Sequence, residues 1–84
     1  MNEELAKVVA AKHLGGHRVW LRFEDGLEGE IELYEALWGP VFEPVREPEY
    51  FGKFIVDMSL EWPNGASLAP EYLYRRLLEA RRSA

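Results

Sequence analysis

Cysteine, threonine and glutamine are absent from the 84 residues, and histidine occurs only twice. Without cysteine the chain can form no disulfide, no thiolate zinc site and no cysteine nucleophile. No apolar run approaches the roughly 18 residues that a membrane span needs, and the acidic start at residues 1–4 lacks the basic and apolar regions of a signal peptide. We therefore expect a cytoplasmic protein that contacts no membrane and is stabilised by packing.

The side chains that usually carry catalysis or bind metal ions are few and unfavourably spaced. His13 and His17 lie four residues apart, but the two glycines between them disfavour the helix that would place both on one face. No serine lies in a G-x-S-x-G nucleophile elbow. Six acids between residues 24 and 35 have no intervening base, yet a solvated strand lacks the desolvated cleft that acid–base chemistry needs. The sequence predicts no enzyme, no cofactor and no metal ion.

The residues that are present suffice for one small globular domain over residues 1–84, with 48% hydrophobic and 30% charged residues. Residues 1–70 hold thirteen acids and six bases, and such an acidic body repels phosphate backbones. The charge of the body therefore disfavours nucleic-acid binding, which could use only the C-terminal arginines. These are Arg75, Arg76, Arg81 and Arg82, which equally suit the negative end of a helix macrodipole.

The clearest local structure is a β-hairpin over residues 17–33, where apolar residues alternate with charged ones on both sides of Asp25-Gly26. A two-residue turn would pair Phe23 with Glu28 and mix apolar with charged side chains on one face. A three-residue loop with Gly26 in the left-handed conformation pairs Phe23 with Leu27 and keeps the faces separate. The register then places Leu21 opposite Gly29 and Val19 opposite Ile31 on one face, and Arg22 opposite Glu28, Trp20 opposite Glu30 and Arg18 opposite Glu32 on the other.

The N-terminal segment, residues 6–14, fits either a helix or a strand buried on both faces, and its pattern leaves both open. Pro48 is expected to begin a short helix that Gly52 ends as its C′ residue, and Pro70 to begin the last helix. After the hairpin we expect helical turns over residues 34–38 and 48–52, then strands over 53–57 and 59–62. The last helix is expected over residues 70–82.

Trp20 is unusual because it falls on the charged face of the predicted hairpin. Either another element of the chain, such as the last helix, covers the ring, or a partner protein does. In the second case Trp20 is an interface anchor surrounded by charge. The candidate interaction face consists of Arg18, Trp20, Arg22, Glu28, Glu30 and Glu32.

Three groups of short motifs follow one another along the chain. They are Phe23-Glu24-Asp25-Gly26, then Gly39-Pro40-Val41-Phe42-Glu43-Pro44-Val45-Arg46 with Tyr50-Phe51, then Trp62-Pro63-Asn64-Gly65 with Leu68 and Leu73-Tyr74. With this ordered series, the chain resembles the small bacterial proteins grouped as domain of unknown function 2442, over roughly residues 6–75. The resemblance implies an α+β domain whose N-terminal segment is a strand, and it implies no established activity.

The resemblance also implies stand-alone small proteins, some encoded beside a second small protein in the manner of toxin and antitoxin pairs. It further implies that some longer relatives append a helix-turn-helix, and we expect no DNA-binding function of that kind here. Family sequences usually carry an acid two residues after the Asn-Gly dipeptide, whereas this chain has Ser67 there, so no role for that carboxylate transfers.

We expect an α+β fold: a small, mostly antiparallel sheet of about five strands, with a short middle helix and the C-terminal helix packed on it. The predicted function is a small non-catalytic protein-binding or regulatory module whose partner is a protein, either itself or a second small protein. The alternative is a nucleic-acid-binding protein that uses its arginine-rich last helix. A candidate ligand groove, whose motifs also suit turns and core, comprises Phe42, Trp62, Asn64, Tyr72 and Tyr74.

Overall fold

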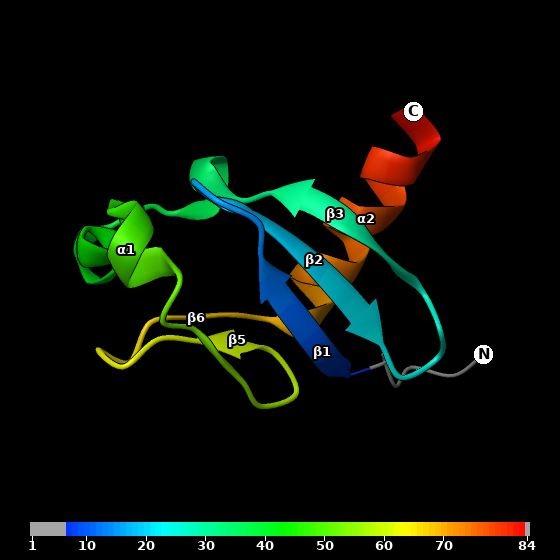
Figure 1. The fold of residues 1–84 in the computed structure, drawn as a ribbon, viewed down its shortest axis with the longest axis horizontal. Helices are drawn as coiled ribbons and strands as arrows, with labels where there is room; N and C mark the ends of the chain where they lie inside the picture. The colour runs from blue at the N-terminus through cyan, green and yellow to red at the C-terminus, as the bar shows by residue number, and fades with distance from the viewer. Residues whose placement is uncertain (1–6, 84) are drawn as a thin grey trace.

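Two antiparallel three-stranded sheets and a C-terminal helix make up the fold of the computed structural model, which describes residues 7–83 (Figure 1). The first sheet, called sheet A, has the order β1-β2-β3, and the second, sheet B, the order β4-β5-β6. The strands are β1 (Val8–His13), β2 (Arg18–Phe23), β3 (Glu28–Glu32), β4 (Ile55–Val56), β5 (Leu60–Glu61) and β6 (Ser67–Leu68). The α+β class is confirmed, and its strands divide between two sheets instead of forming one.

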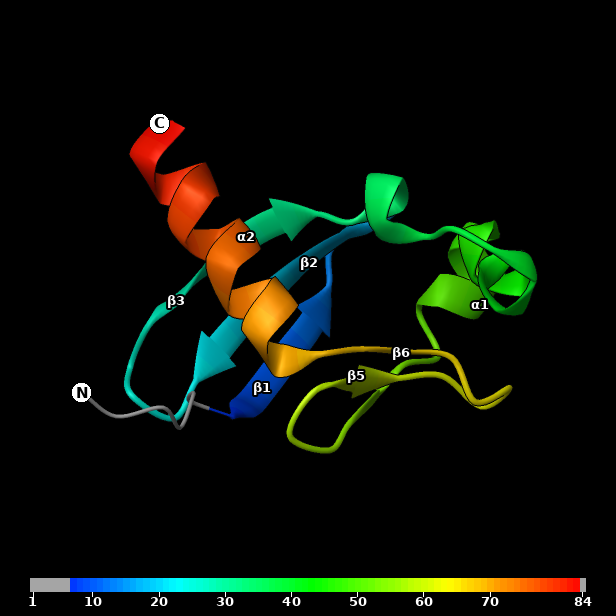
Figure 2. The same cartoon turned by 180° about the vertical axis from the view of Figure 1, so that it is seen from behind.

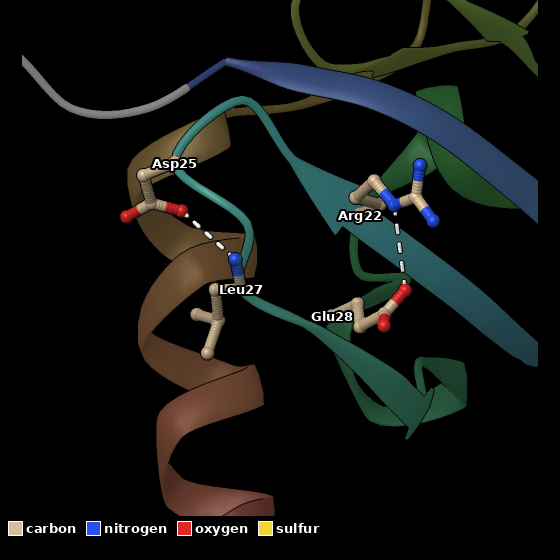
Figure 3. Close-up of polar contacts among 4 residues, drawn as sticks. All are labelled: Arg22, Asp25, Leu27 and Glu28. Atoms are coloured by element: carbon tan, nitrogen blue, oxygen red, sulfur yellow. Dashed lines mark hydrogen bonds and ion pairs between the residues drawn. The ribbon is translucent and has the colours of Figure 1, made fainter.

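The hairpin of β2 and β3 has the predicted register, with Leu21 opposite Gly29 and Trp20 opposite Glu30. The Phe23 amide donates to the Leu27 carbonyl over 2.8 Å, and Gly26 adopts a φ of 96°, so the three-residue loop is confirmed. The Asp25 carboxylate closes this loop by accepting a 3.0 Å hydrogen bond from the Leu27 amide (Figure 3). A strict period of two therefore decides which side chains of the hairpin face the core.

One of the two charge pairs that the register suggests forms directly across the strands. Arg22 contacts Glu28 at 3.4 Å, whereas Arg18 pairs diagonally with Glu30 at 2.8 Å (Figure 3 shows the first pair). The carboxylate of Glu32, which lies opposite Arg18, instead accepts a hydrogen bond from the Tyr34 amide. Both ion pairs are exposed, so their contribution to stability is small.

The N-terminal segment is a strand, as the family resemblance implies, and it links the two sheets. β1 pairs with β2, and a bulge between Val8 and Ala10 turns Val9 outward. The Val8 amide donates to the carbonyl of Met58, which lies between β4 and β5 and has a left-handed φ of 69°. The expected strand over residues 6–14 begins at residue 6, which lies outside the described residues.

Four short helical turns connect sheet A to sheet B. They are η1 (Tyr34–Ala36), η2 (Pro40–Phe42), η3 (Pro44–Arg46) and α1 (Pro48–Phe51), and the last three begin with a proline. The sequence predicts the first and the last of these turns but not η2 and η3 between them. Proline suits these starts because its φ is already helical and its missing amide proton has no helical partner there.

Gly52 follows α1 but does not adopt the left-handed conformation expected of a C′ glycine, since its φ is −69°. Instead, the space at this position is tight, and a side chain there would require the exposed His13 ring to move. A Cβ atom at this position would lie 2.6 Å from Nδ1 of His13, so the end of α1 lies directly against the histidine ring.

The long helix α2 (Pro70–Ser83) begins at the predicted proline and packs on the inner face of sheet A (Figures 1 and 2). Leu73 and Leu77 are fully buried, and Gly29 of β3 leaves room for the latter, because a Cβ there would lie 2.8 Å from Leu77 Cδ1. Sheet A, sheet B, α1 and α2 share one core. Its members are Val8, Val19, Leu21, Phe23, Ile31, Leu33, Leu37, Val45, Phe51, Leu60, Trp62, Ala66, Leu68, Leu73 and Leu77.

Candidate interaction surface

Both histidines hold neighbouring segments together. His13 Nε2 donates to the Gly16 carbonyl over 2.8 Å, and His17 Nε2 donates to the Arg46 carbonyl over 2.6 Å. Both rings also pack against Phe51, whose ring centroid lies 5.4 Å from that of His13 and 5.1 Å from that of His17. Within residues 7–83, no group of three or more His, Cys, Asp or Glu side chains is placed to hold a metal ion. In each histidine, Nε2 therefore donates a hydrogen bond to a backbone carbonyl.

The predicted interaction face forms the outer surface of sheet A, opposite the face on which α2 packs, and at the β3 edge Arg18, Glu30 and Glu32 also line a hollow with residues of α2. Trp20 is half-buried there, with Lys12 Nζ 5.8 Å and the Arg22 guanidinium 5.6 Å from its ring centroid. Part of its cover thus comes from long side chains of the same sheet, including Lys12 of the neighbouring strand β1. The last helix does not cover the ring because α2 packs on the opposite face, and cover by a partner protein stays a prediction. The alternation of β2 and β3 brings together Arg18, Trp20, Arg22, Glu28, Glu30 and Glu32.

Three of the five candidate groove residues join the loops around sheet B. Trp62 is buried, and its Nε1 donates a 2.8 Å hydrogen bond to the Phe51 carbonyl. The ring of Phe42 contacts the ring of Trp62 edge-on. Asn64 Nδ2 donates to the Val41 carbonyl over 2.8 Å, which ties the turn between β5 and β6 to η2. These contacts give the three side chains structural roles.

The other two groove candidates both belong to α2 and lie apart from each other. The hydroxyl of Tyr74 donates a 2.6 Å hydrogen bond to the Asp25 carboxylate at the tip of the hairpin, and its ring packs edge-on against Phe23. This hydrogen bond lowers the pKa of Asp25 and raises the pKa of Tyr74. Tyr72 instead accepts a hydrogen bond from Arg76. The five residues therefore do not line one common groove.

The four arginines of α2 do not form a single row. Because successive helical residues are about 100° apart, Arg75 and Arg82 lie roughly opposite the buried leucines, while Arg76 and Arg81 lie on either side. Arg76 Nη2 donates to the Glu32 carbonyl over 2.7 Å and so fastens α2 to the end of β3. The other three are exposed.

Trp38, which the sequence analysis did not single out, is the most exposed large hydrophobic side chain in the described residues, at 74%. It follows the buried Leu37 and precedes Gly39, whose φ of 90° favours glycine. Arg46 Nε donates to the Leu37 carbonyl over 2.8 Å, and the Arg46 guanidinium lies 6.0 Å from the Trp38 ring centroid. The backbone that carries Trp38 is thus anchored, while its ring faces solvent with one guanidinium beside it.

Two open hollows flank Trp38. The smaller, of about 220 Å³, is lined by Tyr34, Glu35, Leu37, Trp38 and Arg46. The larger, of about 400 Å³, lies where the segment after η1 meets β6 and the start of α2, and it is lined by Glu35, Ala36, Trp38, Ser67, Leu68, Ala69 and Tyr72. We call the residues Tyr34, Glu35, Trp38, Arg46 and Tyr72 the Trp38 surface.

Glu35 lines both hollows. Its side chain is exposed, and within residues 7–83 no hydrogen bond or ion pair engages its carboxylate. A third hollow, of about 360 Å³, lies between β3 and α2, but there Arg18 and Arg76 already contact Glu30 and the Glu32 carbonyl. On the Trp38 surface, aromatic rings therefore lie together with a carboxylate that no described residue engages.

A family model described as "Protein of unknown function (DUF2442)" matches residues 8–79. The chain belongs to this family. The match runs from β1 into α2, so the whole Trp38 surface lies within the DUF2442 domain. No curated protein and no solved structure matches the chain. Among residues 7–83, no helix combines the length and the apolarity that a membrane crossing requires.

Proposed function

We propose that this DUF2442 domain is a small, non-catalytic protein-binding module whose partner docks on the Trp38 surface. The observation that carries the proposal is the exposed indole of Trp38, which lines two hollows. Tryptophan is enriched at interface hot spots because its large ring removes much apolar surface from water when a partner covers it. A second small protein, as in the toxin and antitoxin pairs that the family resemblance implies, is the class of partner we propose.

The anchored backbone at Trp38 supports this role. Leu37 is buried, Gly39 sets the turn, and Arg46 bonds the backbone beside the ring. A segment whose backbone is already ordered loses less conformational entropy when a partner binds. Less of the binding energy of the indole is therefore offset by ordering of the segment that carries it.

The outer face of sheet A is a weaker candidate for the same role. There Arg18 and Arg22 are engaged by glutamates, and Trp20 is half-covered by Lys12 and Arg22. A partner would have to displace these contacts before it reached the ring. Binding of nucleic acid is likewise disfavoured by the formal net charge of −5 and by the engagement of Arg76.

The proposal is tested by identifying a partner and measuring its dependence on Trp38. Tagged protein expressed in the native host is purified after mild cross-linking, and the intact complex is weighed by mass spectrometry. The identified partner is then produced separately and titrated by calorimetry with the wild type, Trp38→Ala and Trp20→Ala. We expect Trp38→Ala to weaken binding at least roughly thirtyfold, the scale of an interface hot spot, and Trp20→Ala to have little effect.

Because Trp38 is exposed, its replacement should leave the free energy of unfolding within about 0.5 kcal/mol of the wild type. Urea unfolding of each variant therefore controls for loss of fold. Undiminished affinity of Trp38→Ala for the partner, or an affinity lost only in Trp20→Ala, would refute docking on the Trp38 surface.

A further inference from the structure

The larger hollow beside Trp38 has an unusual combination of lining groups. Two aromatic rings, Trp38 and Tyr72, and one carboxylate, Glu35, line it together with small or aliphatic residues. No basic side chain is among the lining residues. Its volume of about 400 Å³ lies toward the lower end of the range of small-ligand pockets, roughly 300–1,000 Å³, and gives room for a side chain of a partner.

These groups favour a positive charge. The faces of aromatic rings attract cations, and the Glu35 carboxylate is engaged by no other described residue. A neutral apolar group that filled the hollow would take water from this carboxylate without replacing its hydrogen bonds, which is unfavourable. An anionic group would be repelled by Glu35.

The chain itself shows that both rings accept cations. The Arg46 guanidinium lies 6.0 Å from the centroid of Trp38, and the Arg76 guanidinium lies 5.8 Å from that of Tyr72. Neither arginine lines the larger hollow. The parts of the two rings that face the hollow are therefore left for a group from outside the chain.

We infer that the larger hollow binds one cationic side chain, a lysine or an arginine, of the partner protein, in contact with its lining residues Trp38, Tyr72 and Glu35. The inference rests on the proposed docking of a partner on the Trp38 surface and specifies the chemistry of the contact. The formal net charge of −5 favours the approach of a basic partner.

The test uses the N-acetylated, C-amidated derivatives of lysine and arginine as probes, with the norleucine derivative as the neutral control. Each is titrated into isotopically labelled protein while the indole N–H signal of Trp38 is followed by NMR. We expect the two cationic probes to shift this signal with affinities on the order of millimolar, and added salt to weaken the effect. Norleucine should shift it much less.

Glu35→Gln removes the charge at nearly constant size and should abolish the preference for the cationic probes. The matched control is Glu24→Gln, which removes an exposed glutamate in the hairpin turn and should behave as the wild type. Shifts of equal size from norleucine, shifts that persist in Glu35→Gln, or no response to either cationic probe would overturn the cation site.

The complex separates this inference from the proposed function. With the identified partner, Glu35→Gln should weaken binding roughly fivefold, as expected for a partly exposed charge contact, while Glu24→Gln should not. If Trp38→Ala weakens binding but Glu35→Gln does not, docking stands and the cation contact is refuted. If neither change affects binding, both are refuted.

Discussion

The hydroxyl of Tyr74 joins the last helix to the tip of the hairpin, far from it in sequence. It donates to the Asp25 carboxylate, which also accepts the amide of Leu27. The hydrogen bond favours the ionised carboxylate and the neutral phenol, so the pKa of Asp25 falls below its usual 3.8 and that of Tyr74 rises above its usual 10.0. Stability should therefore depend on pH at both extremes.

We expect Tyr74→Phe to be less stable than the wild type by an amount that is constant between about pH 5 and pH 9. The contribution of Asp25 is present above its unfolded pKa of 3.8 and is lost as the pH falls through the lower folded value. The contribution of Tyr74 is present below its unfolded pKa of 10.0 and is lost as the pH rises through the higher folded value. Urea unfolding at a series of pH values measures this difference.

The control for this series is Tyr34→Phe, since the hydroxyl of Tyr34 makes no hydrogen bond within the described residues and the side chain is exposed. Its free energy of unfolding should follow that of the wild type across the whole pH range. A difference between wild type and Tyr74→Phe that stayed unchanged at both extremes would contradict the hydrogen bond.

At the scale of single elements, the contact of β3 with α2 depends on the absence of a side chain at Gly29. Gly29→Ala would bring a Cβ within 2.8 Å of Leu77 Cδ1, and Leu77 is fully buried and cannot turn away. We expect a loss of about 1–3 kcal/mol in the free energy of unfolding, as in other overpacked cores. Chemical denaturation measures it.

A double mutant tests the cause of this loss. Leu77→Ala alone leaves a cavity and should cost about 2–5 kcal/mol, but it also makes room for a methyl group at position 29. Together the two changes should therefore cost clearly less than the sum of their separate effects. If the two losses in the free energy of unfolding simply add, α2 and β3 can move apart to accept the methyl group without strain.

The hairpin was predictable in detail because apolar and charged residues alternate along a strand that has one buried face, so the sequence carries a period of two. The pairing of Leu21 with Gly29 and the loop ending in Gly26 follow from that period alone. By contrast, β6 is only Ser67–Leu68, and a two-residue strand has no period to detect. Its existence depends on pairing with β5, which the turn after Trp62 brings about.

The division into two sheets and the exposure of Trp38 were not predictable for a related reason. Both depend on which segments meet in space. An isolated bridge from Val8 to Met58 joins the two sheets in the described residues. The residues around Val8 and Met58 carry no sequence pattern that separates such a bridge from the continuous pairing of a single sheet. Trp38 resembles a core aromatic in sequence, and only the packing of Leu37 inward turns it outward. The position of Gly52 against His13 is likewise a tertiary contact.

At the scale of the whole molecule, one cluster of buried residues draws on both sheets and on α2. Trp62 lies in this cluster and contacts Phe51 and Phe54, so its fluorescence reports on the packing around sheet B. The circular dichroism signal is dominated by α2 and sheet A, which are longer. If the core is shared, neither part should unfold without the other.

We therefore expect the urea transitions followed by tryptophan fluorescence and by far-ultraviolet circular dichroism to coincide, as in a two-state domain. The double variant Trp20→Phe, Trp38→Phe leaves Trp62 as the single tryptophan of the sequence, and its fluorescence transition should still coincide with the circular dichroism transition. A fluorescence change that preceded the loss of helix would show that sheet B opens independently.

The joint between the sheets has one further consequence. Met58 supplies the carbonyl that receives β1, yet its backbone is left-handed and more than half of its side chain is in water. That conformation costs an L-residue about 1–2 kcal/mol, whereas glycine enters it freely. Replacing Met58 by glycine, which deletes its side chain, should therefore raise the melting temperature of this domain.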